Sequence, residues 1–130
     1  MRKVVIEVDD KWTVIIFVDV DYDRYDIVES ALTDILTPTS VIDDIYNKIA
    51  YRYNSGFTYS NPYFRTSIVG INSQTSREEL MDTLTHEIDH VQADICEYYE
   101  IDLDSEPAAY LIGYLAKCFY RACYKCLCNY

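Results

Sequence analysis

The chain has two histidines, and they lie four positions apart in the segment His86-Glu87-Ile88-Asp89-His90. Residues four apart on an α-helix return to nearly the same face, so two imidazoles at this spacing can bind one metal ion. The glutamate after the first histidine points about a quarter-turn away, where its carboxylate can hold a water molecule. The motif therefore indicates one zinc ion and zinc-assisted hydrolysis, with Glu87 as the general base.

A catalytic zinc normally has three protein ligands and one open water position, so this motif needs a further donor. The chain has no third histidine, which leaves a carboxylate as the default. Glu106 is the predicted third ligand, because it opens the next predicted helix after a short connection that returns the chain beside the histidine helix. Glu97, Asp102 and Asp104 are competing ligands, and Glu106 can also be read as a first-turn acid favoured by the helix dipole.

The histidine motif lies in the middle of a long predicted helix. Ser76 followed by Glu79 matches a capping box, so the helix should run from residue 76 to about residue 97 or 98. The histidines project from another side than the apolar stripe, which consists of Leu80, Leu84, Ile88, Val91 and Ile95. The helix can therefore pack through one side and present its ligands on another. Ser105-Glu106-Pro107 predicts the start of the next helix, over residues 105–120.

The remaining segments predict an α+β fold in one domain that spans residues 1–130. Residues 4–8 and 13–20 are rich in Val, Ile and Phe, and the polar link Asp9-Asp10-Lys11 between them predicts a β-hairpin. Apolar spacing predicts helices over residues 26–36 and 40–52, and a strand is expected over residues 64–71. The segment between the second of these helices and that strand is expected to be rich in loops.

The composition excludes some classes of partner. Asp and Glu number 22 against 11 Lys and Arg, and the net charge of -11 repels phosphate backbones, so nucleic acid is not an expected partner. No apolar run approaches the roughly 18 residues that cross a bilayer, so a membrane is not expected either. The first residues lead into a predicted strand without the pattern of a cleavable leader, which indicates an unsecreted protein.

The five cysteines favour a reducing compartment, and hence the cytoplasm, because their number is odd and four of them crowd the C-terminus. Cys118, Cys123, Cys126 and Cys128 could together bind a structural zinc, but the two separated C-x-x-C pairs typical of such sites are missing. The alternative is that they are buried or tail thiols.

The segment His86-Glu87-x-x-His90, followed by Glu106 on the next helix, resembles the gluzincin branch of the zinc peptidases. The spacing and the segment from Glu106 to Tyr110 are also similar to small ImmA/IrrE-type and minigluzincin proteins, and to zincin-like proteins of phages and mobile elements. The likeness covers roughly residues 68–115. It implies a zincin-like fold: a small twisted sheet whose edge strand lies along the cleft, with the histidine helix beneath it and the glutamate helix alongside. The predicted strand 64–71 would be that edge strand.

The resemblance also implies an activity, namely a zinc-dependent metallopeptidase that hydrolyses peptide bonds of a protein or peptide through a zinc-activated water. No histidine remains to stabilise the oxyanion, so the hydroxyl of Tyr110 or Tyr114 is expected to take that role. The alternative is a catalytically inactive zincin-fold protein that binds zinc and acts through protein–protein interaction. The missing oxyanion donor and the small size favour this alternative, whereas the intact Glu87 favours the enzyme.

Overall fold

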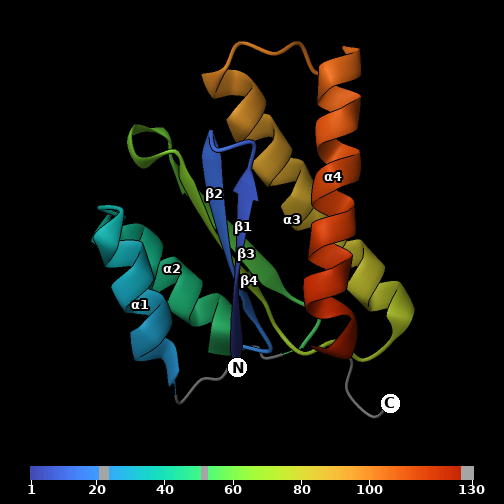
Figure 1. Ribbon diagram of the computed structural model, residues 1–130. Coiled ribbons are helices and arrows are strands. Elements are labelled where there is room, and N and C mark those ends of the chain that lie inside the picture. The colour runs from blue at the N-terminus through green and yellow to red at the C-terminus, as the bar shows by residue number, and fades with distance from the viewer. Residues whose placement is uncertain (21–23, 51–52, 127–130) are drawn as a thin grey trace.

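Four strands form one mixed sheet in the order β1-β2-β4-β3 (Figure 1). The computed structural model describes residues 1–20, 24–50 and 53–126, and of residue 126 it describes the backbone alone. The strands are β1 (Arg2–Val8), β2 (Trp12–Val18), β3 (Gly56–Asn61) and β4 (Thr66–Ile71). β2 runs antiparallel to β1 and parallel to β4, and β3 runs antiparallel to β4.

The hairpin predicted between β1 and β2 is confirmed. Asp9 and Asp10 both have positive φ angles, of 51° and 56°, and the Lys11 N–H donates a 2.9 Å hydrogen bond to the Val8 carbonyl. Two central residues in this conformation form the kind of tight turn that matches the twist of the flanking strands, and Asp tolerates it better than most residues. The link between the two strands is therefore a tight turn with Asp9 and Asp10 at its centre.

The edge strand on the side of α3 is β3, and the expectation that residues 64–71 form that edge is wrong. β4 pairs with β2 on one side and β3 on the other, so it is an inner strand, and residues 67–71 are all buried. Side chains buried on both faces are typical of inner strands. β4 also begins later than predicted, at Thr66, because Pro62–Phe64 forms a 3₁₀ turn, η2.

Phe57 fixes β3 to the rest of the sheet. Its ring is 2% exposed and lies over Gly70, its partner in the antiparallel register. A Cβ atom at position 70 would lie 2.1 Å from the Phe57 Cε1 atom, so a larger residue there would displace the ring. The glycine in β4 therefore makes room for the side chain that holds the edge strand in place.

All four predicted helices are present: α1 (Tyr25–Asp34), α2 (Thr39–Ala50), α3 (Arg77–Tyr98) and α4 (Glu106–Cys123). α1 ends two residues before its predicted end, the predicted end of α2 at residue 52 lies outside the described residues, and α4 continues past residue 120 into a 3₁₀ turn, η3 (Tyr124–Cys126). The fold is α+β, as predicted. Within the described ranges, no helix combines the length and the apolar character that crossing a membrane requires.

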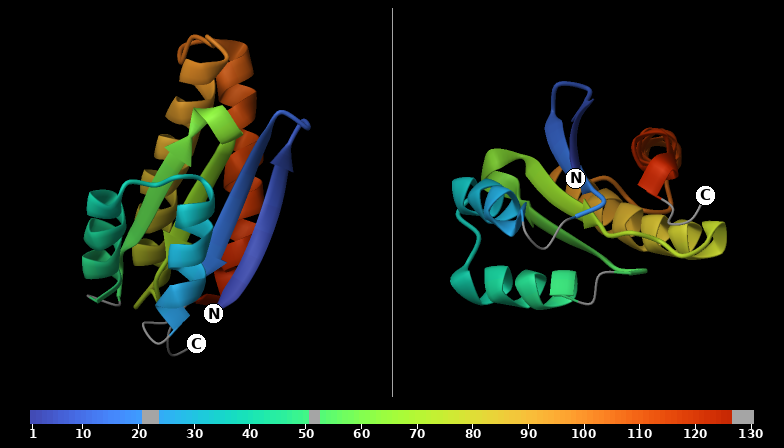
Figure 2. Two further views of the ribbon diagram at one scale, coloured as in Figure 1. Left: turned by 90° about the vertical axis from the view of Figure 1, so that its left-hand side faces the viewer. Right: turned by 90° about the horizontal axis from the view of Figure 1, so that it is seen from below.

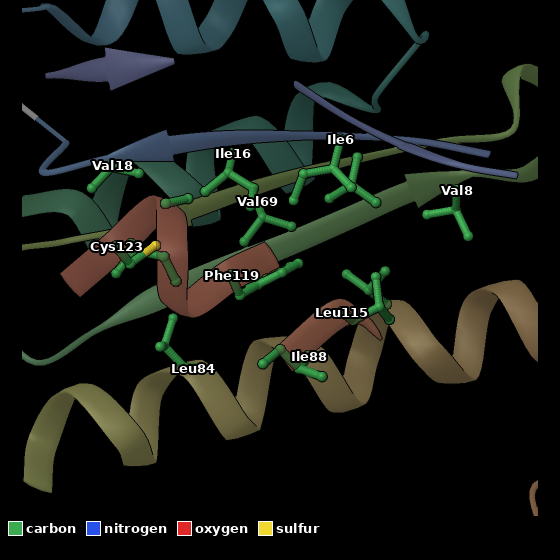
Figure 3. Close-up of a cluster of buried hydrophobic side chains, with 14 of the residues drawn as sticks. Ile6, Val8, Ile16, Val18, Val69, Leu84, Ile88, Leu115, Phe119 and Cys123 are labelled. Carbon is green, nitrogen blue, oxygen red and sulfur yellow. The ribbon is translucent and has the colours of Figure 1, made fainter. Parts of the chain in front are cut away.

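The helices cover the two faces of the sheet in pairs (Figure 2). Successive side chains of a strand point to opposite faces, so Ile16 and Val18 of β2 join one core and Phe17 joins the other. The larger core lies between the sheet and α3 and α4, with Leu84 and Leu115 among its members (Figure 3). The second core contains buried residues of α1 and α2. This packing fixes how α3 is rotated about its axis.

Candidate metal centre

The histidine helix, α3, forms and orients as its sequence predicts. The Ser76 hydroxyl accepts a 3.1 Å hydrogen bond from the Glu79 N–H, which satisfies a donor at the helix start, and Glu78 and Glu79 place negative charge in the first turn. The predicted apolar stripe is buried against the sheet. Because that stripe faces inward, His86 and His90 lie on an exposed side of the helix.

The two imidazoles are close enough to share a metal ion. Their Nε2 atoms lie 3.2 Å apart, and the ring planes are inclined by 80°. Two zinc–nitrogen bonds of about 2.0–2.1 Å meeting at the tetrahedral angle would separate the nitrogens by roughly 3.3–3.4 Å. The same separation also suits a hydrogen bond between the two rings, in which one nitrogen donates and the other accepts.

Glu87 faces the sheet instead of the solvent. Its side chain is 3% exposed, and the Thr58 hydroxyl on β3 donates a 2.8 Å hydrogen bond to its Oε1 atom. A Cβ atom at position 56 would lie 3.1 Å from both Cγ and Oε2 of Glu87, so the backbone of β3 passes close to the carboxylate. The ligand atoms of His86, Glu87 and His90 all lie within 4.8 Å of one another. The motif therefore gathers two imidazoles and one carboxylate.

An open cleft of about 380 Å³ lies beside His86 and Glu87. Its walls come from the end of α2, the start of β3 and the first half of α3, and its lining consists of Lys48, Asn54, Ser55, Gly56, Asp82, Thr83, His86 and Glu87. Lys48 is the one lysine or arginine in this lining, which also contains the acidic side chains Asp82 and Glu87. Two residues of the motif, His86 and Glu87, are therefore reached from this cleft.

Hydrogen bonds between two connecting segments hold the wall of this cleft in place. The buried Asn72 side chain donates a 2.6 Å hydrogen bond to the Ser55 hydroxyl, and the Asn54 amide donates one of 2.9 Å to Thr75. The Thr83 hydroxyl of α3 donates to the buried Gln74 side chain at 3.0 Å. The sequence analysis did not identify Asn72 and Gln74 as residues that support the cleft. Their one signal in the sequence is that two amide side chains stand between a strand and a helix.

Glu106 is not brought together with the histidines. Among the described residues, the group of potential metal ligands consists of His86, Glu87 and His90, without Glu106. The Gln92 side chain of α3 donates a 2.9 Å hydrogen bond to the Ala108 carbonyl, so the first turn of α4 lies on the Gln92 side of α3. At about 100° of rotation per residue, Gln92 points roughly 160° away from His90. α4 does run back beside α3, but next to another face.

The competing carboxylates lie elsewhere as well. Asp102 accepts a 3.0 Å hydrogen bond from the Asp104 N–H, and its carbonyl accepts one from the Ser105 hydroxyl at 2.5 Å, so these residues shape the connection into α4. Glu97 lines a separate pocket together with Asp94 near the end of α3. In the part of the chain that the structure describes, none of the three joins the ligand atoms of the histidine motif.

The two predicted oxyanion donors belong to a different cavity. Tyr110, which is 76% exposed, and Tyr114 line a space of about 600 Å³ between the β1–β2 hairpin and α4. The Tyr114 hydroxyl donates a 3.2 Å hydrogen bond to the Glu7 carbonyl on β1, and a hydrogen bond with Cys118 raises the pKa of Tyr114. The structure therefore does not bring either tyrosine to the histidine pair. Lys48, which sequence reasoning did not select, lines the histidine cleft instead.

The described cysteines do not form a metal cluster of their own. Cys96 and Cys118 are free thiols, burial raises the pKa of Cys96, and Cys123 lies in the core against the sheet. The Cys126 side chain and Cys128 lie outside the described residues. The four-cysteine zinc site considered from the sequence therefore lies partly outside the described structure.

No family model, curated protein or solved structure matches this chain. The likeness to gluzincins consequently rests on the motif residues themselves. What the site offers chemically is two imidazoles that can hold a divalent cation, a buried carboxylate next to them and a cation across an open cleft. These groups suit the activation of a water molecule and the stabilisation of negative charge.

Proposed function

We propose that this protein is a zinc-dependent metallopeptidase of zincin-like fold, which hydrolyses peptide bonds of a protein or peptide substrate. The observation that carries the proposal is the 3.2 Å separation of the His86 and His90 Nε2 atoms beside a buried Glu87. That separation fits two ligands of one tetrahedral ion. The free thiols of Cys96 and Cys118 suit a reducing compartment, so the proposal includes the cytoplasm.

Zinc, when bound, polarises the substrate carbonyl and makes a water molecule acidic enough to attack at neutral pH. His86 and His90 would hold the ion on the exposed side of α3. Glu87 accepts the proton of the attacking water and passes it to the leaving amine, which leaves the carboxylate unchanged after one cycle. β3 pairs with β4 along one of its edges in the described residues, and its other edge can align an extended peptide by main-chain hydrogen bonds.

Lys48 takes the role of oxyanion donor in this proposal. It stands at the last turn of α2, where a lysine is also favoured by the helix dipole, and it lines the same cleft as His86 and Glu87. An ammonium group aimed at the developing negative charge stabilises the transition state more than the ground state. The proposal assigns this role to Lys48 in place of Tyr110 and Tyr114, which line another cavity.

The third protein ligand stays a prediction. Glu106 can serve only if the first turn of α4 leaves its contact with Gln92, since that contact places the turn beside another face of α3. Asp82 lines the cleft one helical turn before His86 and is a carboxylate that the sequence reasoning did not consider. In either case the cleft, which His86 and Glu87 line, leaves room for a water molecule beside the motif.

A zinc-binding protein that acts by docking is the second candidate. It is favoured by one observation, namely that no histidine or tyrosine outside the motif lines the described cleft, so oxyanion stabilisation would rest on the exposed Lys48 and the polar groups of Asn54 and Ser55. Zinc would then stabilise α3, which carries both histidines, without taking part in a reaction.

An unbiased peptide library, incubated with the zinc-loaded wild type and with Glu87→Gln, tests the proposal. The variant should keep its zinc, because Glu87 is assigned to the water and not to the ion, and should lose hydrolysis by a factor of about 10² or more. Asp89→Asn, an exposed acid between the histidines, is the matched control and should cleave as the wild type does. Cleavage that persists in Glu87→Gln contradicts the assignment, and no cleavage by any form favours the docking protein.

A further inference from the structure

Glu87 has two chemically different roles open to it. Its carboxylate lies close enough to both imidazoles to become a third ligand of the ion, since all three ligand atoms lie within 4.8 Å. A carboxylate that binds the ion no longer serves as a base for the attacking water. Whatever holds Glu87 in place therefore decides whether this carboxylate is a third ligand of the ion or a base for the attacking water.

The hydroxyl of Thr58 holds the Glu87 carboxylate in place. The Thr58 hydroxyl donates a 2.8 Å hydrogen bond to Oε1 of Glu87, across the contact between the edge strand and α3. Thr58 pairs with Val69 in the sheet, and side chains of alternate residues share a face, so Gly56 and Thr58 both face α3 while Phe57 points into the opposite core. The buried Phe57 ring keeps β3 from sliding, and the hydroxyl consequently has a fixed position.

Gly56 completes the arrangement from the other side of the carboxylate. The space in which its missing Cβ atom would stand is 3.1 Å from Oε2 and only 2.8 Å from the Gly70 carbonyl oxygen. The strand therefore fits against the carboxylate without a side chain between them. Glu87 is bonded through Oε1 and packed near Oε2, with both contacts made by residues of one strand.

We infer that Thr58 is a positioning residue: its hydroxyl keeps the Glu87 carboxylate on β3 and away from the metal, so that Glu87 acts on water and does not become a ligand. This inference rests on the proposed function, because it presupposes zinc on the histidine pair. A hydrogen bond to an ionised group is among the stronger ones in proteins, and its loss shifts the equilibrium between two carboxylate positions by about tenfold or more.

The affinity for zinc itself reports this role without any substrate. Thr58→Val removes the hydroxyl while keeping the shape of the side chain and its preference for a strand. Glu87 is then free to bind the ion, and zinc affinity should rise about tenfold. Glu87→Gln alone should leave zinc affinity within about twofold of wild type, and Glu87→Gln combined with Thr58→Val should abolish the gain. Thr58→Ser restores the donor and should bind zinc as the wild type does.

Competition titration of zinc against a chromophoric chelator, at one pH, measures all of these affinities. Thr13→Val is the matched control, because Thr13 also donates to a glutamate, Glu7, at 3.0 Å, but on β2 away from the cleft. An unchanged affinity in Thr58→Val, or a gain that persists in the double variant, overturns the inference. His86→Ala separates this failure from that of the proposed function: if it leaves zinc affinity unchanged, the ion is not on the histidines and both fall.

Discussion

The Nε2 atoms of His86 and His90 lie 3.2 Å apart, one turn from each other on the exposed side of α3, while the opposite stripe of that helix is buried under the sheet. The burial of the stripe is what holds the two rings at the surface. We therefore expect that zinc binding and the stability of the fold can be changed separately by substitution, because both imidazoles lie outside the core.

Purified protein should carry about one zinc per chain, and either His86→Ala or His90→Ala should lower zinc affinity by about a hundredfold or more, since each removes one ligand of the ion. Elemental analysis after removal of loosely bound metal gives the stoichiometry. Both variants should melt, in the absence of metal, within a few degrees of the wild type, because both side chains are exposed. Full zinc retention in the double variant would move the site elsewhere in the chain.

Glu106→Gln should leave zinc affinity within about twofold of wild type in the arrangement that the structure describes, because the first turn of α4 contacts the Gln92 side of α3. Asp82→Asn, which changes a carboxylate in the cleft, is the comparison variant. A tenfold or larger loss in Glu106→Gln would support Glu106 as the third ligand and would require α4 to shift when zinc binds.

Lys48→Met should lower kcat by about 10² while KM changes little, because the ammonium group acts on charge that develops in the transition state. Lys48→Arg should keep part of the activity, since it preserves the charge with a different geometry. Lys117→Met on α4 removes the same charge outside the cleft and should behave as the wild type. A rise in KM with unchanged kcat would instead assign Lys48 to substrate binding.

Tyr25 should make the stability of the fold depend on pH in the alkaline range. Burial, together with the nearby acids Glu29 and Asp43, raises its pKa from 10.0 to about 12, and its hydroxyl donates a 2.8 Å hydrogen bond to the Ile42 carbonyl. A raised pKa in the folded state means that the unfolded chain loses its proton first, so this contribution is complete below pH 10 and is lost between about pH 10 and 12.

The free energy of unfolding, measured with denaturant, should therefore fall as the pH rises through that window. The free energy of unfolding of Tyr25→Phe should fall less steeply with pH than that of the wild type. At pH 7 it should be about 1 kcal/mol lower than that of the wild type, because the variant lacks the hydrogen bond to Ile42. Equal slopes in the two proteins would show that Tyr25 does not carry this dependence.

Most helices and strands could be predicted from the sequence, because the residues that indicate each of them lie within or next to that element. The hairpin follows from two β-rich runs around Asp9 and Asp10, and α3 follows from its cap at Ser76 and its apolar stripe. β3 was missed since its three strand-forming residues, Phe57 to Tyr59, are surrounded by Gly, Ser and Asn, which predict loops. Its pairing with β4 supplies the stability that its own sequence does not indicate.

The ligand spacing within one helix could also be predicted, whereas the contributions of other elements to the site could not. The placement of Glu106 depends on which face of α3 receives α4. The hydrogen bond from Gln92 to Ala108, which are 16 residues apart in the sequence, marks that face. Thr58 and Lys48 reach the site from β3 and α2, and nothing in their local sequence indicates it. Such relationships depend on tertiary packing, which a single sequence does not display.

X-ray absorption at the zinc edge, on protein loaded with one equivalent of zinc, reports the ligands of the ion. We expect two imidazole nitrogens at about 2.0–2.1 Å with oxygen ligands in the remaining positions, and no sulfur shell. The spectrum of His86→Ala should lose one imidazole. A shell of sulfur at about 2.3 Å in the wild type would place the ion on the cysteines and contradict a metal centre at His86 and His90.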